Sequence, residues 1–219
     1  MAGGTLSVVV PDRGAWLKQR AADPVARPGG EPPYWADIWP ASVAVARWLL
    51  RRTDLSGRAV LDLGCGLGVP GTAAARAGAT VTFADREVDA LAFASFNATR
   101  AGAAAPTACV LDWHRDTIAG SFDLIVLADV TYRPVHHQPV LRQIQAALAP
   151  RGICLHADPF RRESDGFLVL ARQNFCAREQ TLATFFGVRR VPIRLTFLAR
   201  QDDVFDAWCP RDPAPVGEP

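Results

Sequence analysis

Short apolar runs alternate with stretches of helical periodicity along most of the chain. The runs have the length and β-branched content of buried strands, and between them apolar residues recur every three or four positions, as on one face of a helix. Strands are predicted at 59–63, 79–84, 107–111, 122–128 and 153–157, and helices at 43–50, 72–77, 88–100, 137–148 and 165–174. This succession predicts a parallel sheet with right-handed crossovers, in which 122–128, the most apolar run, lies at the centre.

The two ends of the chain follow a different pattern. Two β-like runs at 180–186 and 191–199, joined by a glycine turn, predict a closing antiparallel pair. Residues 1–33 contain a β-like run, a helical turn and a stretch dense in proline and glycine, which predicts an accessory segment and linker over the active-site end. We expect one domain at 34–201 and a flexible, proline-rich tail at 202–219.

Composition narrows the class of protein. The chain has 219 residues, of which 49% are apolar, enough for one substantial core. A net charge of +2 without a dense basic tract disfavours nucleic acid as a partner, and no apolar run approaches the length of a membrane span. Five cysteines without C-x-x-C spacing predict a reduced, cytoplasmic protein without a disulfide framework or a metal site.

A glycine-rich turn after the first predicted strand is the main chemical signal. Gly64, Gly66 and Gly68 stand at alternate positions, immediately before a predicted helix. Glycine adopts positive φ freely and brings backbone N–H groups close to a ligand, while the helix start adds a positive dipole end. The pattern predicts a nucleotide-binding turn.

Acidic residues distinguish among nucleotides. Asp62 stands two residues before the first glycine, where it would repel a pyrophosphate but suit an ammonium group, such as that of the methionine end of S-adenosylmethionine. Asp85 ends the next predicted strand, at the position of an acid that accepts the hydroxyls of a ribose. Asp112 follows the third strand, so all three acids should face one crevice; each has the alternative role of a helix cap or strand end.

With these acids in register, the sequence resembles the class I, seven-β-strand S-adenosylmethionine-dependent methyltransferases. The resemblance implies an α/β, Rossmann-like fold: a seven-stranded, mostly parallel sheet with a C-terminal antiparallel pair and helices on both faces. It implies that the methionine end, the ribose and the adenine are held in turn along the crevice, with Asp112 and Trp113 at the adenine. The implied cofactor-binding residues are Trp39, Asp62, Gly64, Cys65, Gly66, Gly68, Asp85, Arg86, Asp112, Trp113 and Ala128.

Further motifs narrow the resemblance. Asp129-Val-Thr-Tyr132 is similar to the D/E-x-x-Y signature after the fourth strand in the family-16 lysine methyltransferases. The aromatic segment 32–40 and the D-P-x-R run at 158–161 look like those of the branch that methylates the electron transfer flavoprotein β subunit. The resemblance spans about 32–200. It implies a protein substrate with an acceptor lysine, with that subunit as a candidate partner, and Asp129 and Tyr132 as catalytic residues.

The chemistry of lysine methylation suits Asp129. A lysine of pKa ~10.4 is not a nucleophile while protonated, so the site must bind a cation and then favour the neutral amine. These demands oppose each other, and we assign Asp129 to binding and orientation and Tyr132 to packing and hydrogen bonding. His136 and His137 are close enough in sequence for a proton acceptor, although histidines are also common at solvent-facing helix starts.

Several alternatives stay open at this point. Tyr34, Trp35 and Trp39 are either a plug over the core or part of a ligand wall. Arg161 and Arg162 are either a contact for an acidic substrate surface or an exposed basic loop. A small-molecule amine N-methyltransferase would have a lid over the site formed by 1–33, whereas a protein acceptor needs an open rim. A nicotinamide-dependent oxidoreductase and a non-catalytic binding module are the remaining classes.

Overall fold

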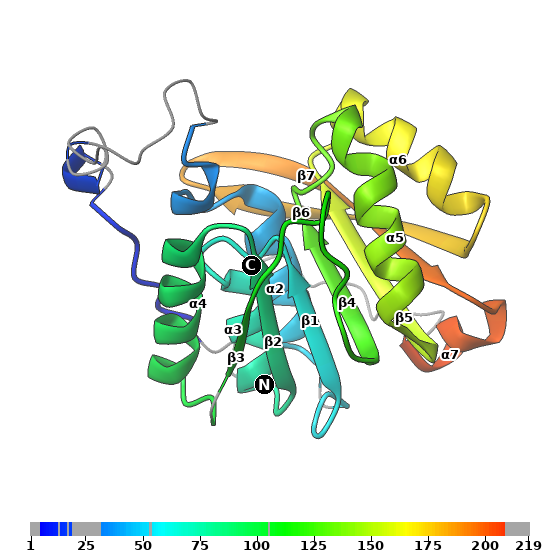
Figure 1. Ribbon diagram of the computed structural model, residues 1–219, viewed down its shortest axis with the longest axis horizontal. Coiled ribbons are helices and arrows are strands. Elements are labelled where there is room, and N and C mark those ends of the chain that lie inside the picture. The colour runs from blue at the N-terminus through cyan, green and yellow to red at the C-terminus, as the bar shows by residue number, and fades with distance from the viewer. Residues whose placement is uncertain are drawn as a thin grey trace.

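A seven-stranded sheet with helices on both faces forms the body of the molecule (Figure 1). The computed structural model describes residues 5–12, 14–16, 18, 32–52, 54–104 and 106–208. The strand order is β3-β2-β1-β4-β5-β7-β6, with β7 antiparallel to its neighbours and the other pairs parallel. The predicted fold class is confirmed.

Every predicted strand and helix of the domain is present, with shifted ends. The strands are β1 Ala59–Leu63, β2 Thr80–Asp85, β3 Thr107–Val110, β4 Phe122–Ala128, β5 Leu148–Asp158, β6 Cys176–Phe186 and β7 Arg189–Ala199. The helices are α2 Pro40–Leu49, α3 Val69–Arg76, α4 Val88–Arg100, α5 His137–Ala147, α6 Arg162–Arg172 and α7 Phe205–Trp208. Three short 3-10 turns are η1 Tyr34–Ala36, η2 Pro134–His136 and η3 Asp202–Val204.

Alternation along the strands divides the core into two layers. Leu124 and Val126 of β4 pack with α2, α3, α4 and α7, whereas Ile125 and Leu127 pack with α5 and α6. All four side chains are fully buried, because β4 lies between β1 and β5 and is covered on both faces. The prediction that this strand is central is thereby confirmed.

The strand order places a crevice beside β1. From β1 the chain winds outward through β2 to β3, and then returns to β4 on the other side of β1. Loops at the carboxyl ends of β1 and β4 therefore diverge, which is where open α/β sheets bind ligands. Among the described residues, no helix is long and apolar enough to cross a membrane.

Two helices begin earlier than the sequence pattern predicts. The first helix begins at Pro40, and Ser42 lies inside it with its hydroxyl donating to the backbone oxygen of Trp39. In α6 the N-cap residue is Arg161, which makes no side-chain cap bond, and Ser164 and Asp165 lie inside the helix. Both helices start earlier than predicted because Pro40 suits a first helical position and because α6 starts directly after the short 159–161 turn.

The chain after residue 201 does not begin as a loose tail. It forms η3 and α7, and Val204, Phe205 and Trp208 are buried in the core layer beside α2. Arg52 donates to the backbone oxygen of Trp208 and lies over its indole ring. The expectation of a flexible 202–219 is wrong for 202–208; the remainder lies outside the described residues.

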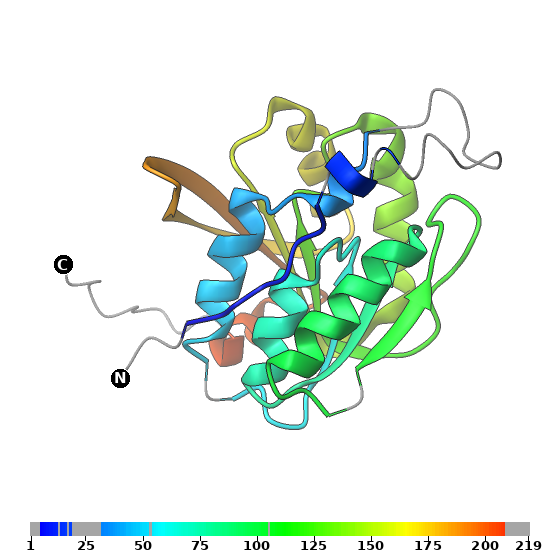
Figure 2. The same cartoon turned by 90° about the vertical axis from the view of Figure 1, so that its left-hand side faces the viewer.

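The N-terminal segment runs along the helices on one face (Figure 2). Residues 5–12 form no strand. Instead, the side chain of Asn97 on α4 bonds both the N–H and the oxygen of Val9, and Arg76 on α3 donates to the oxygen of Thr5. The predicted linker at 24–33 and helical turn at 15–22 fall mostly outside the described residues.

Candidate active site

A cavity opens at the carboxyl ends of β1, β2 and β4, bounded by the loops after these strands and by the segment before α2. Every residue of the predicted cofactor set lines it except Gly68, and Asp129 and Tyr132 line it as well. The three acids Asp62, Asp85 and Asp112 thus face one crevice, as their positions after successive strands require. Trp16, Trp35 and Glu87 also line the cavity and were not in the predicted set.

The glycine turn depends on close backbone approach. Gly64 and Gly66 have φ of 71° and 50°, and a Cβ on Gly66 would lie 3.1 Å from the backbone oxygen of Trp35. A Cβ on Gly64 would come within 3.0 Å of Val130 and 3.2 Å of Trp113. The turn therefore keeps its backbone exposed to the cavity while side chains from two other loops press against it.

Gly68 has a packing role instead. Its φ is 71°, and a Cβ there would meet the Cβ of Ala94 at 2.6 Å. Gly71 is as tightly enclosed, since its Cβ would lie 2.3 Å from the ring of Phe83. The predicted assignment of Gly68 to the cofactor cavity is therefore wrong. Gly64 and Gly66 line the cavity, whereas Gly68 lies at the contact of α3 with α4 and β2.

Asp62 lies at the base of the cavity and is 1% exposed. Its Oδ2 accepts the N–H of Gly71, 2.8 Å away, in the first turn of α3. Burial raises the pKa of this carboxyl to about 7, against the opposing effect of that hydrogen bond, and the charge of Asp85 raises it further. Its negative charge is therefore costly in the absence of a cation.

Asp85 organises the rim between β2 and α4. One carboxylate oxygen accepts the N–H of Gly66 at 3.0 Å, and the other accepts the N–H of Glu87 at 3.0 Å. Burial raises the pKa of Asp85, opposed by these two bonds. The bonds fix the carboxylate over the glycine turn, and its oxygens retain lone pairs for hydroxyl donors.

Trp113 and Asp112 form the far end of the cavity. Asp112 accepts the N–H of His114 in a local turn, while Trp113 packs edge-to-face against His136 with ring centroids 5.4 Å apart. His136 is 4% exposed, and its Nδ1 lies 2.9 Å from Nε2 of His114. Burial, with neighbouring positive groups, lowers the pKa of His136 to about 4, so it is neutral at pH 7 and does not face solvent.

Asp129 has the most unusual environment in the site. It has φ of 61° and is 8% exposed, and its Oδ1 accepts the Nε–H of Arg161 at 2.6 Å. Its Oδ2 is buried without a hydrogen-bond partner. Burial raises the pKa of Asp129, although the ion pair with Arg161 opposes this rise. A buried acceptor without a partner in a ligand cavity is a group with capacity for a donor.

Aromatic rings wall the cavity beside Asp129. Tyr132 is half-buried and packs edge-to-face against Tyr34 and His136, at centroid distances of 5.7 and 5.9 Å. Tyr34 in turn contacts Trp39, whose indole N–H donates to the backbone oxygen of Tyr34. Tyr34 and Trp39 thus line the cavity, whereas Trp35 lines it and also belongs to the buried core, so the segment contributes to both.

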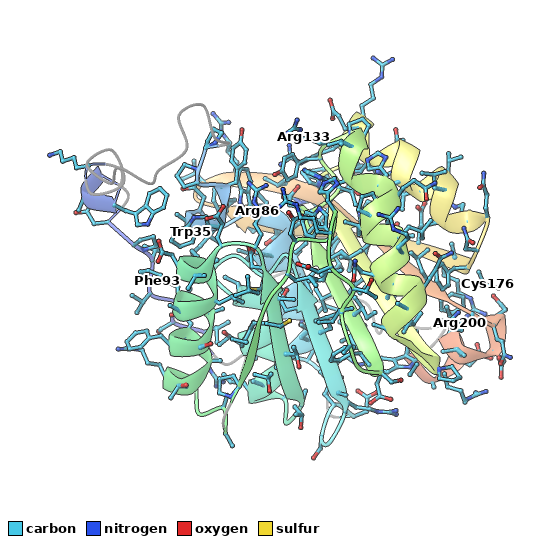
Figure 3. The ribbon with its side chains drawn as sticks, in the orientation of Figure 1. Trp35, Arg86, Phe93, Arg133, Cys176 and Arg200 are labelled. Atoms are coloured by element: carbon cyan, nitrogen blue, oxygen red, sulfur yellow. The ribbon has the colours of Figure 1, made fainter. Side chains whose placement is uncertain are left out.

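Figure 3 shows Trp35 near Phe93 of α4, and Arg86 and Arg133 at the carboxyl edge of the sheet. Trp35 is 8% exposed, and its indole N–H is buried without a partner. Trp16 of the N-terminal segment packs on Trp35, with ring centroids 5.4 Å apart. The segment expected over the active-site end therefore contributes Trp16, Pro32 and Pro33 to the cavity wall.

A buried polar network supports the loop after β4. Thr131 lies between Asp129 and Tyr132, and its hydroxyl bonds Nε2 of His156 at 2.7 Å and Oγ of Ser164 at 3.0 Å. His137 bonds the backbone oxygen of Thr131 at 3.1 Å. His137 is thus a structural residue away from the cavity, and the sequence offered no signal for this network, whose members come from four separate segments.

The described residues contain no group of three His, Cys, Asp or Glu side chains that could hold a metal ion. The lining instead fits a cation-bearing nucleotide, because the carboxylate of Asp85 can accept hydroxyl donors and the buried carboxylate of Asp62 lies at the base of the cavity. The charge of Asp85 raises the cost of ionising Asp62, which an ammonium or sulfonium group offsets.

Comparison with known proteins agrees with this geometry. A family model described as a methyltransferase domain matches residues 54–187, which is more than half of the chain. The chain belongs to this family. The expectation of an S-adenosylmethionine-dependent methyltransferase is therefore confirmed, and the oxidoreductase class is excluded.

The chain is similar to two curated proteins in sequence and to one solved structure in fold. The electron transfer flavoprotein β subunit lysine methyltransferase of Danio rerio is 40% identical over 101 residues, 46% of this chain and 39% of the relative. Protein N-lysine methyltransferase METTL21A of Danio rerio is 31% identical over 153 residues, 66% of this chain and 70% of the relative. Magnesium protoporphyrin IX methyltransferase from Synechocystis, solved with bound S-adenosylmethionine, shares the fold, with a TM-score of 0.57 at 18% identity over 88% of this chain and 99% of that one.

The chain thus spans about two fifths of the length of the flavoprotein-subunit methyltransferase it matches. This relative and METTL21A are both named as protein lysine methyltransferases.

Proposed function

We propose that this protein is a lysine N-methyltransferase acting on a protein substrate, with S-adenosylmethionine as methyl donor. The observation that carries the proposal is Asp129: a buried carboxylate in the cavity with one oxygen fixed by Arg161 and the other without a partner. A lysine ammonium carries three N–H donors and a positive charge, so it would supply the hydrogen-bond donor that Oδ2 of Asp129 lacks.

Residues along the cavity divide the cofactor between them. Asp62 and the backbone of Gly64 would hold the methionine end, Asp85 the ribose hydroxyls, and Trp113 the adenine face. The carboxyl of Asp62 at the base would attract the ammonium, while Asp85 is held in place by Gly66 and Glu87 before any ligand arrives. When bound, the cofactor supplies an electrophilic methyl group attached to a good leaving group.

Asp129 then orients the acceptor rather than removing its proton. Its bond to Arg161 compensates part of its charge, so it attracts the ammonium without holding it as strongly as an isolated buried carboxylate would. Desolvation within the aromatic wall of Tyr34, Trp39 and Tyr132 favours the neutral amine. This balance meets the two opposing demands of lysine methylation, and positioning supplies the remainder of the rate.

The rim supports a protein acceptor over a small amine. Tyr34 in the cavity wall is 38% exposed, and Phe160, which precedes Arg161 in the chain, is 48% exposed, so a protein surface can approach a partly apolar edge here. We infer the electron transfer flavoprotein β subunit of the same organism as the first acceptor to test, on the similarity to the methyltransferases named for it. A cytoplasmic location fits the unpaired cysteines among the described residues.

The test is transfer of radiolabel from S-adenosylmethionine to that subunit and to a lysate, followed by mass spectrometry of the modified residue. Asp129→Asn keeps an oxygen for Arg161 but removes the negative charge, so we expect labelling of lysine to fall by two orders of magnitude or more. Asp203→Asn makes the same change in an exposed ion pair with Arg151 and should leave labelling unchanged. Label on small amines alone would contradict the protein acceptor, and equal labelling by both variants would contradict the role of Asp129.

A further inference from the structure

The β6–β7 hairpin extends beyond the sheet that carries it. β5 pairs with β7 only from Arg194 to Ala199, whereas β6 and β7 remain paired as far as Phe186 and Arg189. The end of the hairpin is therefore a two-stranded ribbon, and Figure 2 shows it projecting from the body of the molecule near α2. Ile193, Leu182 and Val191 of this ribbon pack against the core, whereas the residues nearest the turn are exposed.

The end of this ribbon exposes a cluster of apolar side chains. Phe185, Phe186 and Val188 are 63%, 43% and 98% exposed, within four consecutive positions. Arg189 and Arg190 follow directly, are exposed, and have no acidic partner among the described residues. We call these five residues the hairpin patch. Phe186 and Arg189 are cross-strand partners on the ribbon face that also carries Val191, whereas Phe185 and Arg190 are partners on the opposite face. Scattered exposed apolar residues are normal on a surface, but apolar residues gathered at one ribbon end beside unpaired charges mark an interaction site.

A groove connects the hairpin patch to the candidate active site. Phe186 and Val191 form one end of the groove, and Trp39 and Arg161 form the other. Trp39 also lines the cofactor cavity, and Arg161 holds Asp129. A chain segment that enters the cavity along this groove would therefore pass the hairpin patch.

We propose that the hairpin patch docks the acceptor protein, through a surface that carries acidic side chains around an exposed apolar residue. The inference rests on the proposed function, since the continuity of the groove with the acceptor site is what favours the substrate over any other partner. The charge of Arg189 and Arg190 selects acidic neighbours, and the aromatic rings of Phe185 and Phe186 supply contact area at low entropy cost. Such docking lowers KM for the whole protein without touching the reacting atoms.

Steady-state kinetics on the electron transfer flavoprotein β subunit, or on whichever protein the labelling test identifies, separates docking from catalysis. Phe186→Ser with Val188→Ser, and separately Arg189→Glu with Arg190→Glu, should raise KM for the acceptor protein about tenfold, the effect of ~1.4 kcal/mol of lost contact, while kcat at saturation stays unchanged. The charge reversal should lose most of its effect in high salt, because exposed charges are screened.

Matched variants and a short substrate make the result specific. Phe96→Ser on α4 and Arg142→Glu on α5 repeat the changes on exposed residues elsewhere and should leave KM unchanged. A peptide of about seven residues around the acceptor lysine, chosen without acidic or aromatic side chains, should be methylated equally by the wild type and the hairpin variants, since it lacks the groups that the hairpin patch would contact.

The outcomes distinguish the two proposals. Efficient methylation of the protein by both hairpin variants, with unchanged KM, would overturn the docking proposal and leave the proposed function standing. Absence of lysine labelling by the wild type would overturn both. If KM is unchanged and the wild type, but not the hairpin variants, binds phosphatidylserine vesicles, the patch contacts a membrane instead. If KM is unchanged and the serine variants abolish self-association, the patch contacts a second copy of this chain instead.

Discussion

The raised pKa of Asp62 makes cofactor affinity depend on pH in the neutral range. In the free protein burial brings this pKa to about 7, so a substantial fraction of the carboxyl is protonated at pH 7. A bound ligand with an ammonium group beside Asp62 favours the ionised form and lowers the pKa. Binding must then release a proton wherever the free carboxyl holds one, and affinity falls as pH decreases below 7.

The magnitude follows from the free pKa. If the bound form stays ionised down to pH 5.5, affinity for S-adenosylhomocysteine should weaken about 25-fold between pH 7.5 and pH 5.5, or ~2 kcal/mol. Asp85 has a raised pKa as well and would steepen the fall at the acidic end, whereas His136, with a pKa of about 4, stays neutral throughout this range.

Isothermal calorimetry with S-adenosylhomocysteine measures both affinity and proton release, the latter from the dependence of the heat on the ionisation enthalpy of the buffer. Asp62→Asn still offers an oxygen to the N–H of Gly71, so the fold should survive, but binding at pH 7.5 should be weaker and its decline with acidity shallower. Thermal melts at each pH control for unfolding. Affinity independent of pH, or an equally steep decline in the variant, would refute the coupling of Asp62 to the ligand.

Three further predictions concern stability. His156 is fully buried, and burial, with the nearby Arg194 and His137, lowers its pKa to about 3. As pH falls below ~6.5 the unfolded chain takes up a proton at this histidine and the folded protein does not, so the free energy of unfolding decreases. Urea titration should show that the wild type loses about 2 kcal/mol more of this free energy than His156→Gln does between pH 7 and pH 5. Gly68→Ala should lower the free energy of unfolding in urea by about 3 kcal/mol, because φ is positive and the new Cβ would lie 2.6 Å from that of Ala94. Gly102→Ala, which has positive φ but open space around it, should lower it by about 1 kcal/mol. Equal losses would contradict the packing role of Gly68. Phe205→Ala should lower the free energy of unfolding by about 3–5 kcal/mol because the ring is fully buried, whereas Phe96→Ala, at an exposed ring, should change it little. A small loss for Phe205→Ala would mean that α7 contributes little to the core.

The sequence predicted those parts of the site that depend on local pattern. Asp62, Asp85 and Asp112 stand after successive parallel strands, so their convergence follows from topology alone. The glycine turn is likewise local, because positive φ at Gly64 and Gly66 serves a turn within a few residues. These predictions needed no knowledge of which side chains pack against one another.

The errors share a physical cause, which is contact between segments distant in sequence. Gly68 differs from Gly64 only in facing Ala94 of α4, 26 positions further along the chain, and nothing in the turn itself reports that neighbour. The pattern around Arg161 predicted either a contact for an acidic substrate surface or an exposed basic loop, and did not indicate its partner Asp129, which lies on another loop. Phe205 and Trp208 were hidden by polar and proline-rich neighbours, since a single turn of helix is too short to show periodicity.

Asp129 combines costs that the rest of the fold must offset. Positive φ at a residue other than glycine costs about 1–3 kcal/mol, and a buried acceptor without a partner costs a similar amount. The conformation persists because the backbone N–H of Asp129 bonds Ala157 of β5, Arg161 holds Oδ1, and Thr131 is fastened to His156. These bonds point away from Oδ2. The supporting loop thus fixes the carboxylate in a position where a ligand donor can satisfy Oδ2 without any rearrangement, so binding removes the cost of the unpartnered oxygen while the backbone conformation is retained.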